Sequence, residues 1–237
     1  MAAFMGTRTI AAPAADDSER IRTQLVSQHD VVISSQVEGK IAQLPLKDGD
    51  TFKRGQLLVE FDCELYAAQL RKAEATAEAA NKVYAVNQQL STLRSVGELD
   101  VEQAKAKAKE AEAEAAYVRA TVNRCRVAAP FSGRVAKRLA AQFEYVPVGK
   151  PLLQIVDSDN MELKLNVPSM WLSWLRIGTT LQIHIDDLNT DYAGAIVRLG
   201  ARVDPVSQTL EVIASIKGRA PELLPGMSGW ARFPERR

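Results

Sequence analysis

Apolar and polar residues alternate in short stretches over the first part of the chain. Residues 31–37 alternate in this way, residues 57–61 are mostly apolar, and Gly39 and Gly49 lie between such stretches. A period of two is typical of strands, and glycine accepts the positive φ that tight turns need. The pattern predicts a small, turn-rich β module over residues 21–62.

The same succession of strands and glycines returns after a long interruption. Its first copy comprises residues 37–41, 47–50 and 53–62, and its second copy comprises residues 129–135 and 148–157. If the two copies complete one sheet, the residues between them must project from that sheet. The sequence therefore predicts a β unit split by an insertion, an organisation that favours a connector over a catalyst.

The insertion has the composition of two helices. Residues 63–122 contain no proline and one glycine, Gly97, and strong helix formers lie on both sides of it. Two helices joined by a tight turn are expected. Positions three and four apart on the second helix form a heptad seam, namely Val101, Ala104, Ala108, Ala111, Ala115, Val118 and Val122. The first helix carries a less regular stripe, namely Leu70, Ala73, Ala77, Ala80 and Tyr84, followed by Val83, Asn87 and Leu90.

Strand patterns return in the last third of the chain. They cover residues 161–167, 180–185, 193–199, 210–216 and 229–233. This number and spacing predicts a small barrel or sandwich. A short apolar helix is expected after Pro168, and we expect its Trp171 and Trp174 to close the mouth of the barrel rather than to bind a ligand.

The charge balance excludes some classes of partner. Lys plus Arg number 30 and Asp plus Glu number 29, so the formal net charge is +1. Proteins that bind nucleic acid through its phosphates are usually strongly basic. The near-zero net charge therefore argues against a nucleic-acid partner. No stretch approaches the roughly 20 apolar residues of a membrane helix, and no signal peptide or anchor is visible. Residues 1–20 are expected to form a flexible leader.

Residues for catalysis or metal binding are sparse. The two histidines, His29 and His184, form no Ser/His/Asp or Cys/His arrangement, so no catalytic residue and no enzyme activity are expected. His184 lies between Ile183 and Ile185, and alternation places it on the opposite face as a solvated or satisfied strand histidine. The five methionines show no ligand spacing, so no metal site is expected.

Cys63 and Cys125 are the only cysteines and bracket the insertion. Antiparallel helices would bring these ends together, within the ~4.4–6.8 Å Cα separation that a disulfide requires. Such a bridge would form in an oxidising compartment. The alternative is a pair of small buried side chains, and the sequence leaves both open.

The split β unit resembles a lipoyl or biotinyl carrier domain. In carriers a lysine at a hairpin tip holds the cofactor, within a run such as Glu-Thr-Asp-Lys-Ala. The matching run here is Glu60-Phe61-Asp62-Cys63-Glu64, so the lysine is missing where the helical insertion begins. No cofactor is therefore expected.

Four motifs together resemble the periplasmic adaptor family, also called membrane fusion proteins, of tripartite efflux and type I secretion systems. They are Val37-Glu-Gly-Lys-Ile41, residues 125–135, Val203-Asp-Pro-Val-Ser-Gln-Thr209 and Leu224-Pro-Gly-Met227. The resemblance extends over nearly the whole chain from Ile21 to Phe233.

The resemblance implies a mainly β fold with an α-helical coiled-coil hairpin, in an elongated, modular chain. Its parts would be a lipoyl-like barrel-sandwich hybrid over residues 21–62 and 123–157, the hairpin over residues 63–122 and a β-barrel domain over residues 158–237. The first half of the hybrid can lend a strand to the barrel. A membrane-proximal domain, common in the family, is expected to be absent or truncated.

The resemblance also implies partners. The chain would bridge an inner-membrane transporter, of the resistance-nodulation-division (RND) class before others, to an outer-membrane TolC-like channel protein. It would act as a homo-oligomeric ring, commonly of six, in the periplasm at the inner membrane of a Gram-negative bacterium. An ABC or major-facilitator exporter is the alternative transporter, and a freestanding coiled-coil scaffold is the alternative outside the family.

In RND adaptors the hairpin tip carries an arginine, a leucine four residues later and a serine seven residues after that. Leu93 matches the leucine, whereas Gln89 stands at the arginine and Asp100 at the serine. Asp100 can still cap the second helix through a backbone N–H of its first turn. The channel-docking tip implied by the resemblance comprises Gln89, Leu93, Arg94, Gly97, Leu99 and Asp100.

Overall fold

The structure is a computed structural model that describes residues 20–218, 220 and 222–234 of the chain. The described residues fall into two compact units, one made of both chain ends, up to Gln28 and from Asn160, and the other of His29–Asp159. The leader expected over residues 1–20 lies outside the described residues, apart from Arg20.

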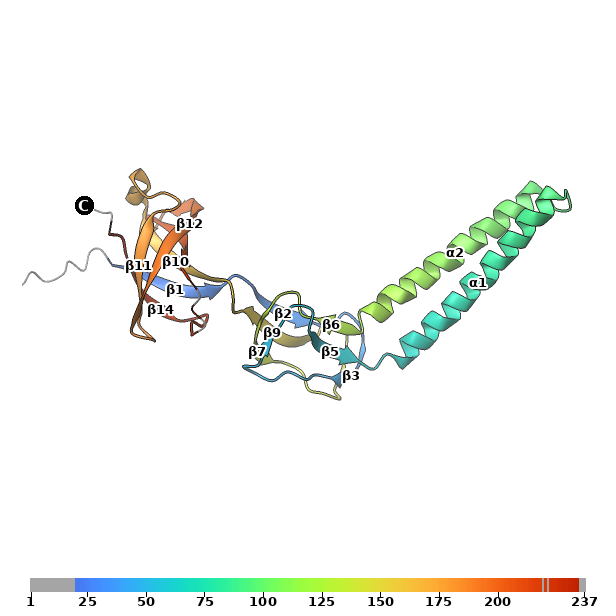
Figure 1. Ribbon diagram of the computed structural model, residues 1–237, viewed down its shortest axis with the longest axis horizontal. Helices are drawn as coiled ribbons and strands as arrows, with labels where there is room; N and C mark the ends of the chain where they lie inside the picture. The colour runs from blue at the N-terminus through green and yellow to red at the C-terminus, as the bar shows by residue number, and fades with distance from the viewer. Residues whose placement is uncertain (1–19, 219, 221, 235–237) are drawn as a thin grey trace, which may run out of the picture. The chain divides into compact units, whose positions relative to one another are not determined.

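The first unit contains a closed barrel of six strands in the order β1-β10-β13-β12-β11-β14 (Figure 1). Their bounds are β1 Ile21–Ser27, β10 Met161–Pro168, β11 Thr180–Ile185, β12 Thr190–Asp204, β13 Thr209–Ile216 and β14 Ser228–Arg232. Strand β1 pairs antiparallel with both β10 and β14 and so closes the barrel. A strand from the start of the chain therefore completes a barrel whose other strands come from its end.

Alternate residues of barrel strands such as β10 and β11 are buried. Leu25, Leu163 and Ile183 are 0% exposed. The short 3-10 helix η2 (Ser169–Ser173) adds Trp171, which is buried and lies edge-on to Phe233 with ring centroids 5.2 Å apart. Trp171 is therefore part of the barrel core, as expected from its apolar surroundings in the sequence.

The second unit contains two four-stranded sheets, in the orders β2-β9-β7-β4 and β6-β5-β3-β8. The strands before the insertion are β2 Asp30–Ser34, β3 Gly39–Gln43, β4 Thr51–Phe52 and β5 Leu57–Phe61. Those after it are β6 Arg126–Ala128, β7 Gly133–Arg138, β8 Tyr145–Val146 and β9 Pro151–Asp157.

The two halves of the split β unit are interleaved in both sheets. In the first sheet β2 and β4 enclose β9 and β7, and in the second sheet β6 and β8 enclose β5 and β3. The expectation of one completed sheet was therefore wrong, because successive strands of each half alternate between the two sheets. Neither half has the partners to complete either sheet alone.

The core between the two sheets draws side chains from both halves. Ile41, Leu58 and Val59 from the first half and Leu153 and Ile155 from the second are all 0% exposed. Burying one such side chain contributes roughly 1.5–3 kcal/mol. This shared core holds together segments that are more than 60 residues apart in the sequence.

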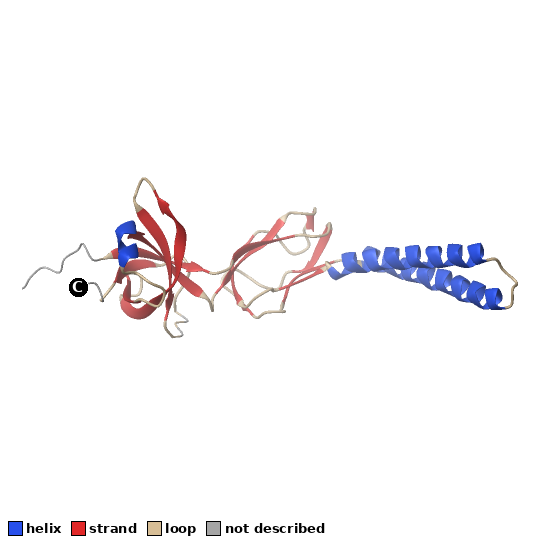
Figure 2. Ribbon diagram, turned by 90° about the horizontal axis from the view of Figure 1, so that it is seen from above, coloured by secondary structure: helices blue, strands red, loops and turns tan. Residues whose placement is uncertain are grey.

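The insertion forms two helices, α1 (Glu64–Thr92) and α2 (Glu98–Asn123). Helix α1 follows β5 and α2 precedes β6, and these strands pair with each other, with Glu60 opposite Arg126. Both views show the helices running antiparallel and side by side, away from the two sheets (Figures 1 and 2). At ~1.5 Å per residue, the 29 residues of α1 extend about 44 Å. None of the helices in the described residues combines the length and apolar character needed to cross a membrane.

Replacing Gly229 by alanine should destabilise the barrel. Gly229 lies in β14, where an added Cβ would stand 1.9 Å from the carbonyl oxygen of His184. Separating the two strands to make room should lower the free energy of unfolding by about 2–3 kcal/mol. Urea denaturation followed by tryptophan fluorescence measures this, because Trp171, Trp174 and Trp230 all lie in the barrel unit.

Gly97→Ala is the matched control for this substitution. Gly97 has a negative φ, and an added Cβ would meet only Asp100, at 3.5 Å. Its unfolding midpoint should stay at that of the unaltered chain. A Gly229→Ala midpoint that also stays there would contradict the close strand contact.

Candidate functional site

The seam expected on the second helix is its least exposed face. Ala104, Ala108 and Ala115 are 3–5% exposed, and the remaining seam residues are half-buried, namely Val101, Ala111, Val118 and Val122. Alanine at the closest positions lets the two helix axes approach each other. Little apolar area is buried per turn, so the outer faces of the hairpin remain available to partners.

The first helix contributes a matching stripe with one departure from expectation. Ala73 and Ala77 are buried, and Tyr84, Asn87 and Leu90 continue the stripe as half-buried residues. Val83 was expected on this stripe, but the prediction was wrong because Val83 is 55% exposed. The stripe instead continues through Tyr84, which lies three residues before Asn87 on the same face of the helix.

Two polar contacts connect the helices at their exposed edges. Glu74 on α1 accepts a hydrogen bond from Arg119 on α2 at 2.7 Å, and Asn81 donates one to Glu112 at 2.7 Å. Exposed pairs of this kind contribute about 0.2–1 kcal/mol each. Their main effect here is on register, because both hold the same alignment of the two helices.

Helix α1 ends at the hairpin tip (residues 89–100) in a Schellman motif. The Arg94 N–H bonds to the Ser91 carbonyl at 2.9 Å, and the Ser95 N–H bonds to the Leu90 carbonyl at 2.9 Å. Arg94 takes the left-handed conformation, with φ 56°, that such a motif requires. The reversal therefore occurs at Arg94, and not at the glycine that marked the turn in the sequence.

Helix α2 begins directly after Gly97, whose backbone is extended with φ −77° and ψ 158°. The Asp100 carboxylate accepts the Gly97 N–H at 3.2 Å. It therefore bonds to the residue that precedes the helix, as the acidic member of a capping box does, rather than to the first turn. Glu98 and Asp100 both place negative charge at the positive end of the helix dipole.

The hairpin tip presents apolar side chains to solvent. Leu93 is 72% exposed and Leu99 is 70% exposed, on either side of the turn. Gln89 and Arg94 are also exposed, and the Gln89 carbonyl accepts the Thr92 hydroxyl at 2.6 Å. The structure thus places all six sequence-predicted tip residues in the turn between α1 and α2 or in the helix ends next to it, with two leucines available for an apolar contact.

A disulfide joins Cys63 and Cys125 at the base of the hairpin. Their Cα atoms are 6.3 Å apart across a sequence separation of 62. Cys63 directly precedes α1, and Cys125 follows α2 by two residues and accepts a hydrogen bond from the Phe61 N–H at its carbonyl oxygen, at 2.9 Å. The bridge fixes the two helix ends next to the β5–β6 pair from which they emerge.

No metal-binding cluster accompanies this arrangement in the described ranges. There, no three His, Cys, Asp or Glu side chains form a group that could hold a metal ion. His29 Nδ1 lies 3.2 Å from Asp157 Oδ2, and His184 Nδ1 lies 2.7 Å from Asp191 Oδ1.

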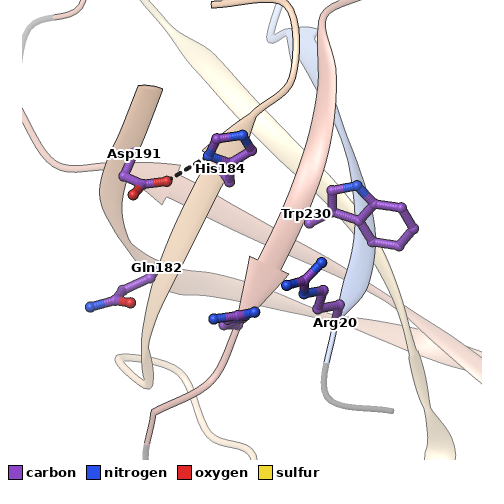
Figure 3. Close-up of a pocket in the computed structure, with 6 residues that line it drawn as sticks. Arg20, Gln182, His184, Asp191 and Trp230 are labelled. Carbon is purple, nitrogen blue, oxygen red and sulfur yellow. Dashed lines mark hydrogen bonds and ion pairs between the residues drawn. The ribbon is translucent and has the colours of Figure 1, made fainter. Parts of the chain in front are cut away.

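A second candidate site, which no motif indicated, lies on the outer wall of the barrel (Figure 3). We call it the barrel-wall pocket, and it is lined by Arg20, Gln182, His184, Asp191, Trp230 and Arg232. Strand alternation places Gln182 and His184 on one face, which the sequence shows. The other residues could not be found from the sequence, because the pairing of β11 with β14 joins segments that are distant along the chain.

Comparison with known protein families matches one model to more than half of the chain. The model is described as the RND MFP, barrel-sandwich hybrid domain, and it matches residues 29–158. This range contains both four-stranded sheets and the helical insertion between their halves.

Two curated proteins are related to the chain at less than 30% identity. The nodulation protein NolF of Rhizobium meliloti (strain 1021) is 24% identical over 210 residues, covering 82% of this chain and 57% of NolF. The multidrug resistance protein MdtA of Yersinia pestis (strain Pestoides F) is 27% identical over 160 residues, covering 61% of this chain and 36% of MdtA. The chain thus spans less than two thirds of the length of either relative.

A solved structure shares the fold. A MacA–MexA chimeric protein that contains the Pseudomonas aeruginosa MexA alpha-hairpin domain superposes with a TM-score of 0.77 at 20% identity. The match covers 90% of this chain and 81% of the chimera. At this identity the likeness shows the fold alone.

The Cys63–Cys125 bridge should be measurable by alkylation and by stability. Chain purified without reductant should incorporate no thiol-alkylating group when denatured, and two groups after reduction, as counted by mass spectrometry. In the chain-entropy model, opening a loop of 62 residues lowers the free energy of unfolding by up to about 4 kcal/mol. Alkylation of either cysteine without prior reduction would refute the bridge. The Cys63→Ser/Cys125→Ser variant should melt at the same temperature with and without reductant.

Proposed function

The chain belongs to the RND membrane fusion protein family, whose members are adaptors and not enzymes, and on this premise we propose that it is the periplasmic adaptor subunit of a tripartite efflux system. Its role would be to hold an inner-membrane transporter, of the RND class before others, to an outer-membrane TolC-like channel protein. The observation that carries the proposal is the hairpin that projects from the interleaved sheets and exposes Leu93 and Leu99 at its tip.

The two helices would act as a rigid arm. The seam of small residues on α2 and the stripe on α1 support coiled-coil packing between them. The disulfide and the β5–β6 pairing would transmit the orientation of the sheets to the arm. A stiff connection of this kind is what an adaptor needs to hold its tip at a fixed distance from its base.

The tip would bind the channel through apolar contact. Two leucines that are at least 70% exposed lie on either side of the turn, and burial of each would stabilise a complex by roughly 1.5–3 kcal/mol. Gln89, Arg94 and Asp100 would supply polar contacts around this centre, with Gly97 at the turn between the helices.

Location and assembly follow from the same proposal. A disulfide persists in the oxidising periplasm, which supports a periplasmic site at the inner membrane of a Gram-negative bacterium. The chain would function as a homo-oligomeric ring, so that several tips meet the channel together.

Two alternatives to this function have to be distinguished by experiment. The transporter could be an ABC or major-facilitator exporter, as in type I secretion. The chain could also be a freestanding coiled-coil scaffold, which would have neither a transporter nor a channel as partner.

Affinity capture from a cross-linked envelope separates these functions. Tagged chain expressed in its native cell should capture both an inner-membrane transporter and an outer-membrane channel protein, identified by mass spectrometry. The transporter's identity gives its class. Recovery of neither protein would favour the scaffold and contradict the adaptor.

Substituting the tip leucines should separate the two partners. Leu93→Asp/Leu99→Asp should reduce capture of the channel at least about tenfold, because two buried apolar contacts are lost, while capture of the transporter is kept. Leu65→Asp is the matched control, since Leu65 is equally exposed, at 70%, but lies at the base of the hairpin. Equal channel capture by the double variant and the unaltered chain would contradict the tip assignment.

A further inference from the structure

The barrel-wall pocket is built from residues that lie in register on neighbouring strands. One row crosses the wall from Arg22 on β1 to Trp230 on β14 and then to His184 on β11, which pairs with Asp191 on β12. The next row pairs Arg232 on β14 with Gln182 on β11. Pairing in the closed barrel fixes both rows, and Arg20 lies directly before β1.

The lining of the pocket contains charged side chains of both signs. Arg20 and Arg232 contribute two guanidinium groups, and Asp191 contributes one carboxylate. Asp191 is already hydrogen-bonded to His184, at 2.7 Å, whereas the Arg232 side chain has no ion pair within the described part of the chain. Arg232 is therefore the cation of the pocket with which a ligand carboxylate would pair.

Trp230 gives the pocket an aromatic wall. Its side chain is 37% exposed although it lies in the middle of a strand pair. Arg22 lies over its ring at 4.9 Å from the centroid and is itself held by Asp186 at 2.8 Å and by Ser228 at 2.8 Å. This contact fixes the indole in place, and Trp230 lines the pocket together with Arg20 and Gln182.

From these features we infer that the barrel-wall pocket binds a small aromatic carboxylate. The guanidinium of Arg232 would take the carboxylate in a bidentate pair, because its planar fork matches the two oxygens. The ring of the ligand would pack against the indole of Trp230, and the amide of Gln182 would donate to the carboxylate from the opposite strand. A cavity of about 310 Å³ is at the small end of ligand sites and fits a single ring.

Isothermal titration calorimetry of the whole chain tests this site at neutral pH and constant ionic strength. Sodium benzoate should bind with a dissociation constant of about 1 mM or tighter. Benzamide lacks the charge, cyclohexanecarboxylate lacks the aromatic ring, and inorganic phosphate lacks the ring and carries more charge. Each should bind at least about tenfold more weakly, because each loses one of the two recognition elements.

Variants then assign the binding to the pocket. Arg232→Gln should weaken benzoate binding at least about tenfold, and Trp230→Leu should remove its preference over cyclohexanecarboxylate. Arg202→Gln is the matched control, since Arg202 is an exposed arginine on β12 outside the pocket lining, and its affinity should be unchanged. Arg232→Lys keeps the charge without the fork and should still weaken binding, which preserves the test if Arg232→Gln does not fold.

Four outcomes would overturn the inference. They are the absence of benzoate binding, an unchanged affinity in both Arg232 variants, an equal loss in Arg202→Gln, and phosphate binding as tight as that of benzoate. The third would show a diffuse charge effect, and the fourth would show an oxyanion site without a preference for the ring. None of these outcomes bears on the adaptor function, because the hairpin tip lies in the other unit.

Discussion

The pairing of β5 with β6 is the constraint on which the rest of the second unit depends. These two strands come from opposite halves of the split β unit, and Glu60 lies opposite Arg126 in their ladder. Because these strands are paired, the insertion of about 60 residues must leave the sheet and return to it at adjacent points. Two antiparallel helices of similar length are the simplest structure that meets this requirement. The interleaved sheets and the Cys63–Cys125 bridge strengthen this one junction. A projecting arm follows from strand pairing before any partner is considered.

Local sequence patterns predicted the helices and strands of this fold, but they did not predict which distant strands pair. Alternation and glycines identified the strands, and the spacing of alanines such as Ala104 and Ala108 identified the buried face of α2. The mainly β class and the barrel-sandwich hybrid were confirmed. The sequence did not show that successive strands alternate between two sheets, because each short strand is apolar enough for either. The sequence pattern also placed Val83 on the buried stripe of α1. In the structure the Val83 side chain faces solvent, and Tyr84 continues the stripe.

The candidate sites show the same division between local and long-range information. The hairpin tip lies within residues 89–100, so the motif around Leu93 brought its residues together in the sequence. The turn itself was missed in detail, because Arg94 rather than Gly97 adopts the positive φ. The barrel-wall pocket unites Arg20, His184 and Trp230, and it exists only because β1 and β11 both pair with β14. No local pattern encodes such a closure.

The central claim is that the hairpin tip contacts an outer-membrane channel protein. Site-specific photocross-linking in living cells tests it most directly, with a photoreactive residue placed at position 93 and, in a second strain, at position 65. The proposed function predicts an adduct with an outer-membrane channel protein from position 93 and none with that protein from position 65. Adducts from position 93 that contain no outer-membrane protein, or the same adduct from both positions, would contradict it.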